Sequence, residues 1–121
     1  MSIHLRREVD KLKKQILTLS AHVEESVQKA VKSIGDRDMR LAQLVVDQDI
    51  VIDQMEVDVE EECLKILALH QPVAIDLRFI IAVLKINNDL ERIGDQAVNI
   101  AERAQFLASR EPVEMPFDFP K

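Results

Sequence analysis

The chain has 121 residues, a length that suits one domain with a shared hydrophobic core. Hydrophobic residues make up 47% of it and charged residues 31%, a balance typical of a globular protein and not of a disordered one. The formal net charge of −6 and the absence of Trp and Tyr argue against a nucleic-acid binder, which usually presents a basic face or an aromatic stacking surface.

The first predicted element is a long helix over residues 4–34. The chain contains only two glycines and four prolines, which favours long uninterrupted elements and argues against an all-β fold rich in turns. Apolar residues at alternating steps of three and four lie on one face of a helix. The first such stripe is Leu5, Val9, Leu12, Ile16, Leu19, Val23, Val27, Ala30 and Ile34. Gly35 is expected to end this helix, and Asp36 or Asp38 can cap the start of the next.

A second stripe predicts a helix over residues 37–70. Its members are Leu41, Val45, Gln48, Ile52, Met55, Val59, Glu62, Ile66 and Leu69. We expect Glu62 to turn outward and the neighbouring Cys63, the only cysteine, to replace it as a small core residue. Pro72 suits the first turn of the following helix.

A third stripe predicts a helix over residues 73–109. Its members are Phe79, Val83, Ile86, Leu90, Ile93, Ala97, Ile100, Ala104 and Leu107. Short connections force neighbouring helices to run antiparallel, so the expected fold is all-α, an antiparallel three-helix bundle with helices about 45 Å long. Residues 1–110 would form this domain, and residues 111–121, which contain three prolines, an extended tail or linker.

Several kinds of site and segment are not found in the sequence. None of the three histidines has a Glu three residues before it, as a di-iron bundle requires, and the two glycines are too isolated for a phosphate-binding loop. No nucleophile, base and orienting acid can be assembled, so we expect no enzyme. The longest apolar run, residues 79–84, is too short to span a bilayer, and the start of the chain lacks a signal-peptide core. We therefore expect a soluble cytoplasmic protein.

Two pairs of carboxylates are predicted to meet at one height. Asp49 and Asp53 share a face of the second helix, and Glu91 and Asp95 share an outward face of the third. The first pair is centred 20 residues before Gln71, at the turn, and the second pair 22 residues after it. In an antiparallel hairpin the pairs would be offset by about 3 Å.

Such a cluster allows two interpretations. Carboxylates gathered at one height repel one another, and oxygen ligands suit Mg²⁺, Mn²⁺, Ca²⁺ or iron. Alternatively, the acids form a solvated face held by salt bridges, with Arg92 able to reach Asp89 or Asp95 at helical spacing. Spacing alone favours the solvated face, since paired acids are common on charged helices.

Three segments resemble the PhoU family of phosphate-uptake regulators. Residues 69–78 (LHQPVAIDLR) are similar to the family's turn between its second and third helices. Residues 88–102 (NDLERIGDQAVNIAE) resemble its acidic signature on the third helix, and residues 49–56 (DIVIDQME) resemble the matching motif on the second. The resemblance covers essentially the whole chain.

The resemblance implies a function. PhoU proteins are cytoplasmic regulators that restrain the phosphate ABC transporter and keep the sensor histidine kinase of the phosphate-starvation system off. They act by contact, and reach the membrane only through these partners. Some bind metal clusters through acid-x-x-x-acid motifs, which correspond here to Asp49 with Asp53 and Glu91 with Asp95. The resemblance therefore favours a patch that holds divalent or trivalent ions such as iron, Mn or Mg, with Asp89, Glu56 and Asn99 as helpers at its edges.

One departure from the family bears on assembly. PhoU proteins usually contain two three-helix repeats, whereas this chain has one. It is expected to be either a fragment or a single-repeat member, in which a homodimer or higher oligomer supplies the second repeat. The alternative function is a helical interaction or scaffold module that binds no metal.

Overall fold

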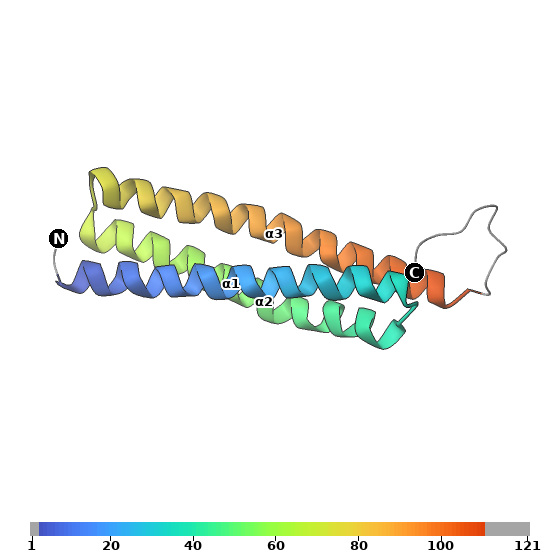
Figure 1. The fold of residues 1–121 in the computed structure, drawn as a ribbon. Helices are drawn as coiled ribbons and strands as arrows, with labels where there is room; N and C mark the ends of the chain where they lie inside the picture. The colour runs from blue at the N-terminus through green and yellow to red at the C-terminus, as the bar shows by residue number, and fades with distance from the viewer. Residues whose placement is uncertain (1–2, 111–121) are drawn as a thin grey trace.

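A computed structural model of the chain describes residues 3–110. It contains α1 (Ile3–Gly35), α2 (Met39–His70) and α3 (Ala74–Ala108). The three helices lie side by side along an elongated molecule, and each packs against the other two (Figure 1). The predicted all-α antiparallel three-helix bundle is confirmed, and the helix bounds agree with the sequence prediction to within two residues. The predicted tail, residues 111–121, lies outside the described residues.

The turn between α1 and α2 is set by side chains. Asp38 caps α2, because its carboxylate accepts hydrogen bonds from the backbone N–H groups of Arg40 and Leu41 at 3.1 and 3.0 Å. Gly35 is the last residue of α1 but does not adopt a positive φ. The left-handed conformation falls instead on Arg37, with φ 52°. The Arg37 guanidinium also donates to the carbonyl of Leu107 at 2.9 Å, joining this turn to the end of α3.

The turn between α2 and α3 departs slightly from the prediction. Gln71 caps α2 in the left-handed conformation, with φ 43°, and its N–H donates to the Leu67 carbonyl. Pro72 is buried within the turn, and α3 begins only at Ala74, so this proline does not stand in the first turn of a helix as predicted. His70 and Glu8, with Nε2 and Oε2 2.9 Å apart, join the end of α2 to α1.

The size of the buried side chains differs between the two halves of the molecule. The half nearer the α2–α3 turn is filled by large side chains such as Leu12, Leu19 and Ile66. The other half is filled mainly by alanines. They are Ala30, Ala42, Ala97, Ala101 and Ala104, together with Val45. Small residues allow helices to approach closely, so this half has little room for branched side chains.

The predicted stripe of α3 is partly wrong. Ile86 and Leu107 are exposed, and Ile93 keeps 41% of its surface accessible. The buried residues in the middle of α3 are instead Asn87 and Gly94. Asn87 donates a hydrogen bond to the Glu56 carbonyl and Gly94 packs against Ile52, whereas the isoleucines lie at the edge. The stripe places Ile93 in the core, from which one expects the charge of Ile93→Asp to be buried at mid-core; this expectation is wrong.

The predicted stripes of α1 and α2 need smaller corrections. Near the end of α1, Ser26 and Ser33 are buried, whereas Ile34 is exposed. On α2, Glu62 is buried and does not turn outward, because Lys11 of α1 reaches it with Nζ 3.6 Å from Oε2. Cys63 is fully buried as expected, and burial raises the pKa of its thiol to about 11.

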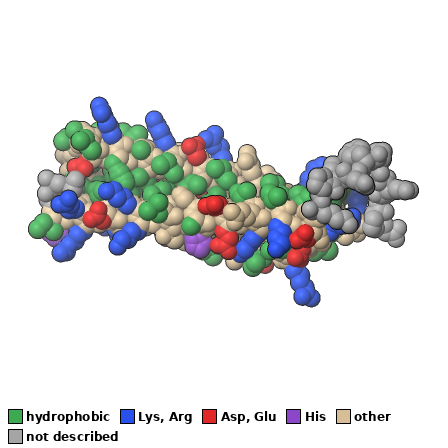
Figure 2. All heavy atoms as spheres, viewed as in Figure 1, with side chains coloured by type: hydrophobic (Ala, Val, Ile, Leu, Met, Phe, Trp, Pro, Cys, Tyr) green, Lys and Arg blue, Asp and Glu red, His purple; other side chains and the backbone are tan. Residues whose placement is uncertain are grey.

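Exposed apolar side chains are frequent on α1 and α3. They include Leu17, Val31, Ile86 and Ile93. Figure 2 shows hydrophobic side chains running in a band along the face that these two helices form. A band of this kind on a small domain is typical of a surface that another protein covers.

Candidate metal centre

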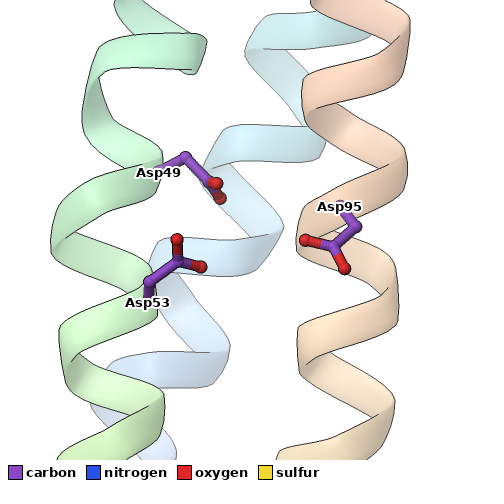
Figure 3. A group of neighbouring side chains, drawn as sticks. All are labelled: Asp49, Asp53 and Asp95. Atoms are coloured by element: carbon purple, nitrogen blue, oxygen red, sulfur yellow. The ribbon is translucent and has the colours of Figure 1, made fainter.

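Three of the four predicted ligands meet between α2 and α3. Asp49, Asp53 and Asp95 each offer a carboxylate oxygen, and these oxygens all lie within 4.8 Å of one another. Figure 3 shows Asp49 and Asp53 extending from α2 toward Asp95 on α3, with α1 behind them. The antiparallel register therefore brings these side chains together, as the height of the pairs along the sequence indicated.

Polar and small residues fix the register of this cluster. Asn87 of α3 donates from Nδ2 to the backbone carbonyl of Glu56 on α2, at 3.1 Å. About two turns nearer the cluster, Gly94 places bare backbone against α2. A Cβ at this position would lie 3.8 Å from both Glu56 Oε1 and Ile52 Cγ2, so the space holds little more than a methyl group. Gly94, the residue before Asp95, thus packs directly against the side chains of Ile52 and Glu56 on α2.

Glu56 is the acid whose position the sequence did not predict. The pattern placed it at the edge of the patch, but the side chain is buried, on the face of α2 that meets α3. Its spacing from Asp49, seven residues, would have identified it, since residues seven apart lie on nearly one line of a helix.

The carboxylates perturb one another. Burial, followed by the charges of Asp53 and Asp95 and a hydrogen bond with Asp53, raises the pKa of Asp49 from 3.8 to about 6. Burial also raises the pKa of Glu56 from 4.5 to about 7, and the charges of Asp53, Glu91, Asp95 and Asp49 add to this effect. Glu91 does not belong to the group of oxygens within 4.8 Å, and its influence is on Glu56.

Basic side chains do not neutralise this cluster. Within residues 3–110, no Lys, Arg or His nitrogen lies within 4.0 Å of these five carboxylates. Arg92, which the sequence allowed to reach Asp95, pairs with Asp89 instead. Convergent, unneutralised oxygens without a nitrogen or sulfur ligand fit a hard cation such as Mg²⁺ or Mn²⁺, or iron.

Comparison with known proteins places the chain in a family. The model of the PhoU domain matches residues 16–104, most of the helical bundle. The chain belongs to the PhoU family. A PhoU homologue from Aquifex aeolicus, named as a phosphate-specific transport system accessory protein, is 42% identical over 110 residues, which are 91% of this chain and 50% of that relative. One from Thermotoga maritima is 39% identical over 88% of this chain and 46% of its own length.

The PhoU fold is also found by structural comparison. The crystal structure of PhoU from Pseudomonas aeruginosa superposes with a TM-score of 0.84 at 43% sequence identity, covering 86% of this chain and 50% of that one. The chain thus spans about half the length of the PhoU proteins that it matches. No helix within residues 3–110 is both long and apolar enough to cross a membrane.

Proposed function

We propose that this chain regulates phosphate uptake, restraining a phosphate ABC transporter and its sensor histidine kinase through protein contacts and without catalysis. The observation that carries the proposal is the 42% identity over 91% of the chain to a protein named as a phosphate-specific transport system accessory protein. The protein would act in the cytoplasm and reach the membrane only through these partners. It would not bind nucleic acid.

A complementation experiment tests this function. The chain is expressed in a bacterium that lacks its own PhoU, and uptake of labelled phosphate is measured in phosphate-rich medium. We expect uptake to fall relative to the empty vector. Unchanged uptake, with the folded chain present in the cells, would refute the proposal for this half-length protein.

We further propose that the cluster binds divalent or trivalent cations, with Asp49, Asp53 and Asp95 as ligands and Glu91 beside them. The support is the convergence of three carboxylate oxygens within 4.8 Å, together with the raised pKa values of Asp49 and Glu56. Neighbouring carboxylates with raised pKa values repel one another when ionised, and a cation bound between them stabilises their charged forms. Iron, Mn and Mg are the candidate metals.

The metal proposal is tested by thermal melting with and without Mn²⁺, Mg²⁺ or iron. Added metal should stabilise the wild type, since a ligand stabilises the state that binds it. The double variant Asp49→Asn with Asp95→Asn should fold as well as wild type but gain nothing from metal. If wild type gains nothing and carries no metal after purification, the acids form a solvated face, and the protein is better described as a metal-free interaction module.

We propose that the chain forms a homodimer or higher oligomer through the apolar band of α1 and α3. The support is the band of hydrophobic side chains in Figure 2, together with the exposure of large apolar residues on both helices, such as Leu17 and Val31 of α1 and Ile93 of α3. Sedimentation at micromolar concentration should show a dimer or larger species, and a strictly monomeric protein would contradict this.

A further inference from the structure

The outer side of α2 carries a second apolar row, distinct from the core. Ile50, Val57 and Leu64 are spaced by seven residues and keep 76%, 46% and 52% of their surfaces exposed. The core of the same helix is formed by other residues, including Ile52, Val59 and Ile66. A seven-residue repeat keeps side chains on nearly one line of a helix, the arrangement that faces a partner helix in coiled-coil packing.

Acids alternate with these apolar residues. Asp53 and Glu60 stand three or four residues from each apolar neighbour, so they lie in the same row. Ile50, Asp53, Val57, Glu60 and Leu64 together form what we call the outer seam of α2. All five side chains are exposed.

The charge of the outer seam is not neutralised by the rest of the domain. Within the described residues, neither Asp53 nor Glu60 has a basic nitrogen within 4.0 Å. Lys65, the basic residue of α2 nearest in sequence, is directed to Glu8 of α1, with Nζ 3.6 Å from Oε1. A second copy of α2 would bring like charges together, which disfavours self-association at this row.

We propose that the outer seam of α2 docks an amphipathic helix of a partner protein that carries aliphatic residues at heptad spacing and Lys or Arg between them. Such a helix would bury the three apolar side chains while its cations approach Asp53 and Glu60. The inference rests on the proposed function, in which the chain acts by contact, and identifies the contact surface and the chemistry of the partner.

Two synthetic helical peptides test this docking. Both carry leucine every seven residues, and one has lysine and the other glutamate at the intervening positions. Fluorescence anisotropy is measured with EDTA present, so that no metal occupies the cluster that contains Asp53. The lysine peptide should bind at least tenfold more tightly than the glutamate peptide, with affinity falling as salt is added.

Matched variants locate the binding. Val57→Ser and Glu60→Lys should each weaken binding of the lysine peptide about tenfold, which corresponds to about 1.4 kcal/mol. Ile3→Ser, at an exposed apolar site of α1, and Glu24→Lys, at an exposed acid of α1, should leave it unchanged. Circular dichroism verifies that all four variants fold.

Three outcomes would overturn the proposal: equal binding of both peptides, no binding, or equal losses in the α1 and α2 variants. A change in oligomeric state on Ile50→Ser would also overturn it, by showing that a second copy covers the outer seam. The phosphate-uptake assay remains an independent measurement. If wild type lowers uptake and Val57→Ser lowers it equally, the docking surface is wrong while the proposed function stands.

Discussion

Neutralising Glu56 should stabilise the metal-free protein at alkaline pH. The Glu56 side chain is buried between α2 and α3, and neighbouring carboxylates add to the effect of burial in raising its pKa from 4.5 to about 7. A carboxyl group whose pKa is higher in the folded than in the unfolded state binds its proton more tightly when folded. Its ionisation therefore lowers the free energy of unfolding as pH rises from about 4.5 through 7.

The magnitude follows from the two pKa values. At pH 8 the difference between 4.5 and about 7 sets an upper limit of about 3 kcal/mol on the cost of ionising Glu56 in the fold. Solvent screening of its exposed neighbours reduces this to about 1–2 kcal/mol. Glu56→Gln removes the charge with little change of shape, so the variant should be more stable by that amount at pH 8 and by about 0.7 kcal/mol near pH 5.

Urea denaturation in EDTA, followed by helical circular dichroism at pH 8 and pH 5, measures the effect. Glu61→Gln is the matched control, because Glu61 is exposed on the same helix and should show no such gain. If Glu56→Gln were less stable than wild type at pH 8, or if its gain were the same at both pH values, the electrostatic account of the cluster would be wrong.

Three further predictions concern α3 and the metal. Ile93→Asp should lower the free energy of unfolding by about 1 kcal/mol or less, because the new charge reaches solvent. Ala97→Asp, at a fully buried site, should unfold the bundle, and thermal melting compares the two variants. Gly94→Ala should raise the free energy of unfolding, measured by urea denaturation, by about 1 kcal/mol, since the methyl group would make only ordinary van der Waals contacts and alanine favours helix. A lower free energy of unfolding would show that the Glu56 side chain cannot move to make room for the methyl group. The rise in melting temperature on adding Mn²⁺ should become smaller as the pH falls from 7.5 to 5.5. A rise that does not depend on pH would show that the ion binds outside the cluster of Asp49, Asp53 and Asp95.

The sequence predicted the helices well because their signals are local. Apolar spacing, scarce glycine and proline, and the capping Asp38 all act within a few residues, and α2 begins at the residue after this cap. The two turns were less well predicted. Arg37 and Gln71 adopt positive φ angles that each turn imposes on residues without a strong preference for them.

The core face of α3 was not predictable from periodicity alone. Ile86 and Ile93 form a regular apolar line, yet Asn87 and Gly94, one position later, face the core. A stripe identifies where large apolar residues lie, whereas burial also depends on contacts with the neighbouring helix, here the hydrogen bond of Asn87 to the Glu56 carbonyl and the packing of Gly94 against Ile52. The isoleucines then remain at the edge.

The site was predictable to the extent that it follows from helical geometry. Spacing of four placed Asp49 and Asp53 on one face, and the antiparallel register brought Asp95 to their level. Which acid would be buried depended on the approach of α2 to α3 at Gly94, a tertiary feature. This is why Glu56 was expected at the edge, although burial and then the charges of four neighbouring acids raise its pKa to about 7.

The raised pKa values make protons and cations competitors for the same oxygens. Near neutral pH both Asp49 and Glu56 are close enough to their pKa values, about 6 and about 7, to hold protons part of the time. A cation bound between α2 and α3 must displace those protons, so its apparent affinity falls in acid. The metal-free protein, by contrast, gains stability as the same groups become protonated. Opposite pH dependences with and without metal would therefore distinguish a cation site from a solvated acidic face, for which the two curves would run parallel.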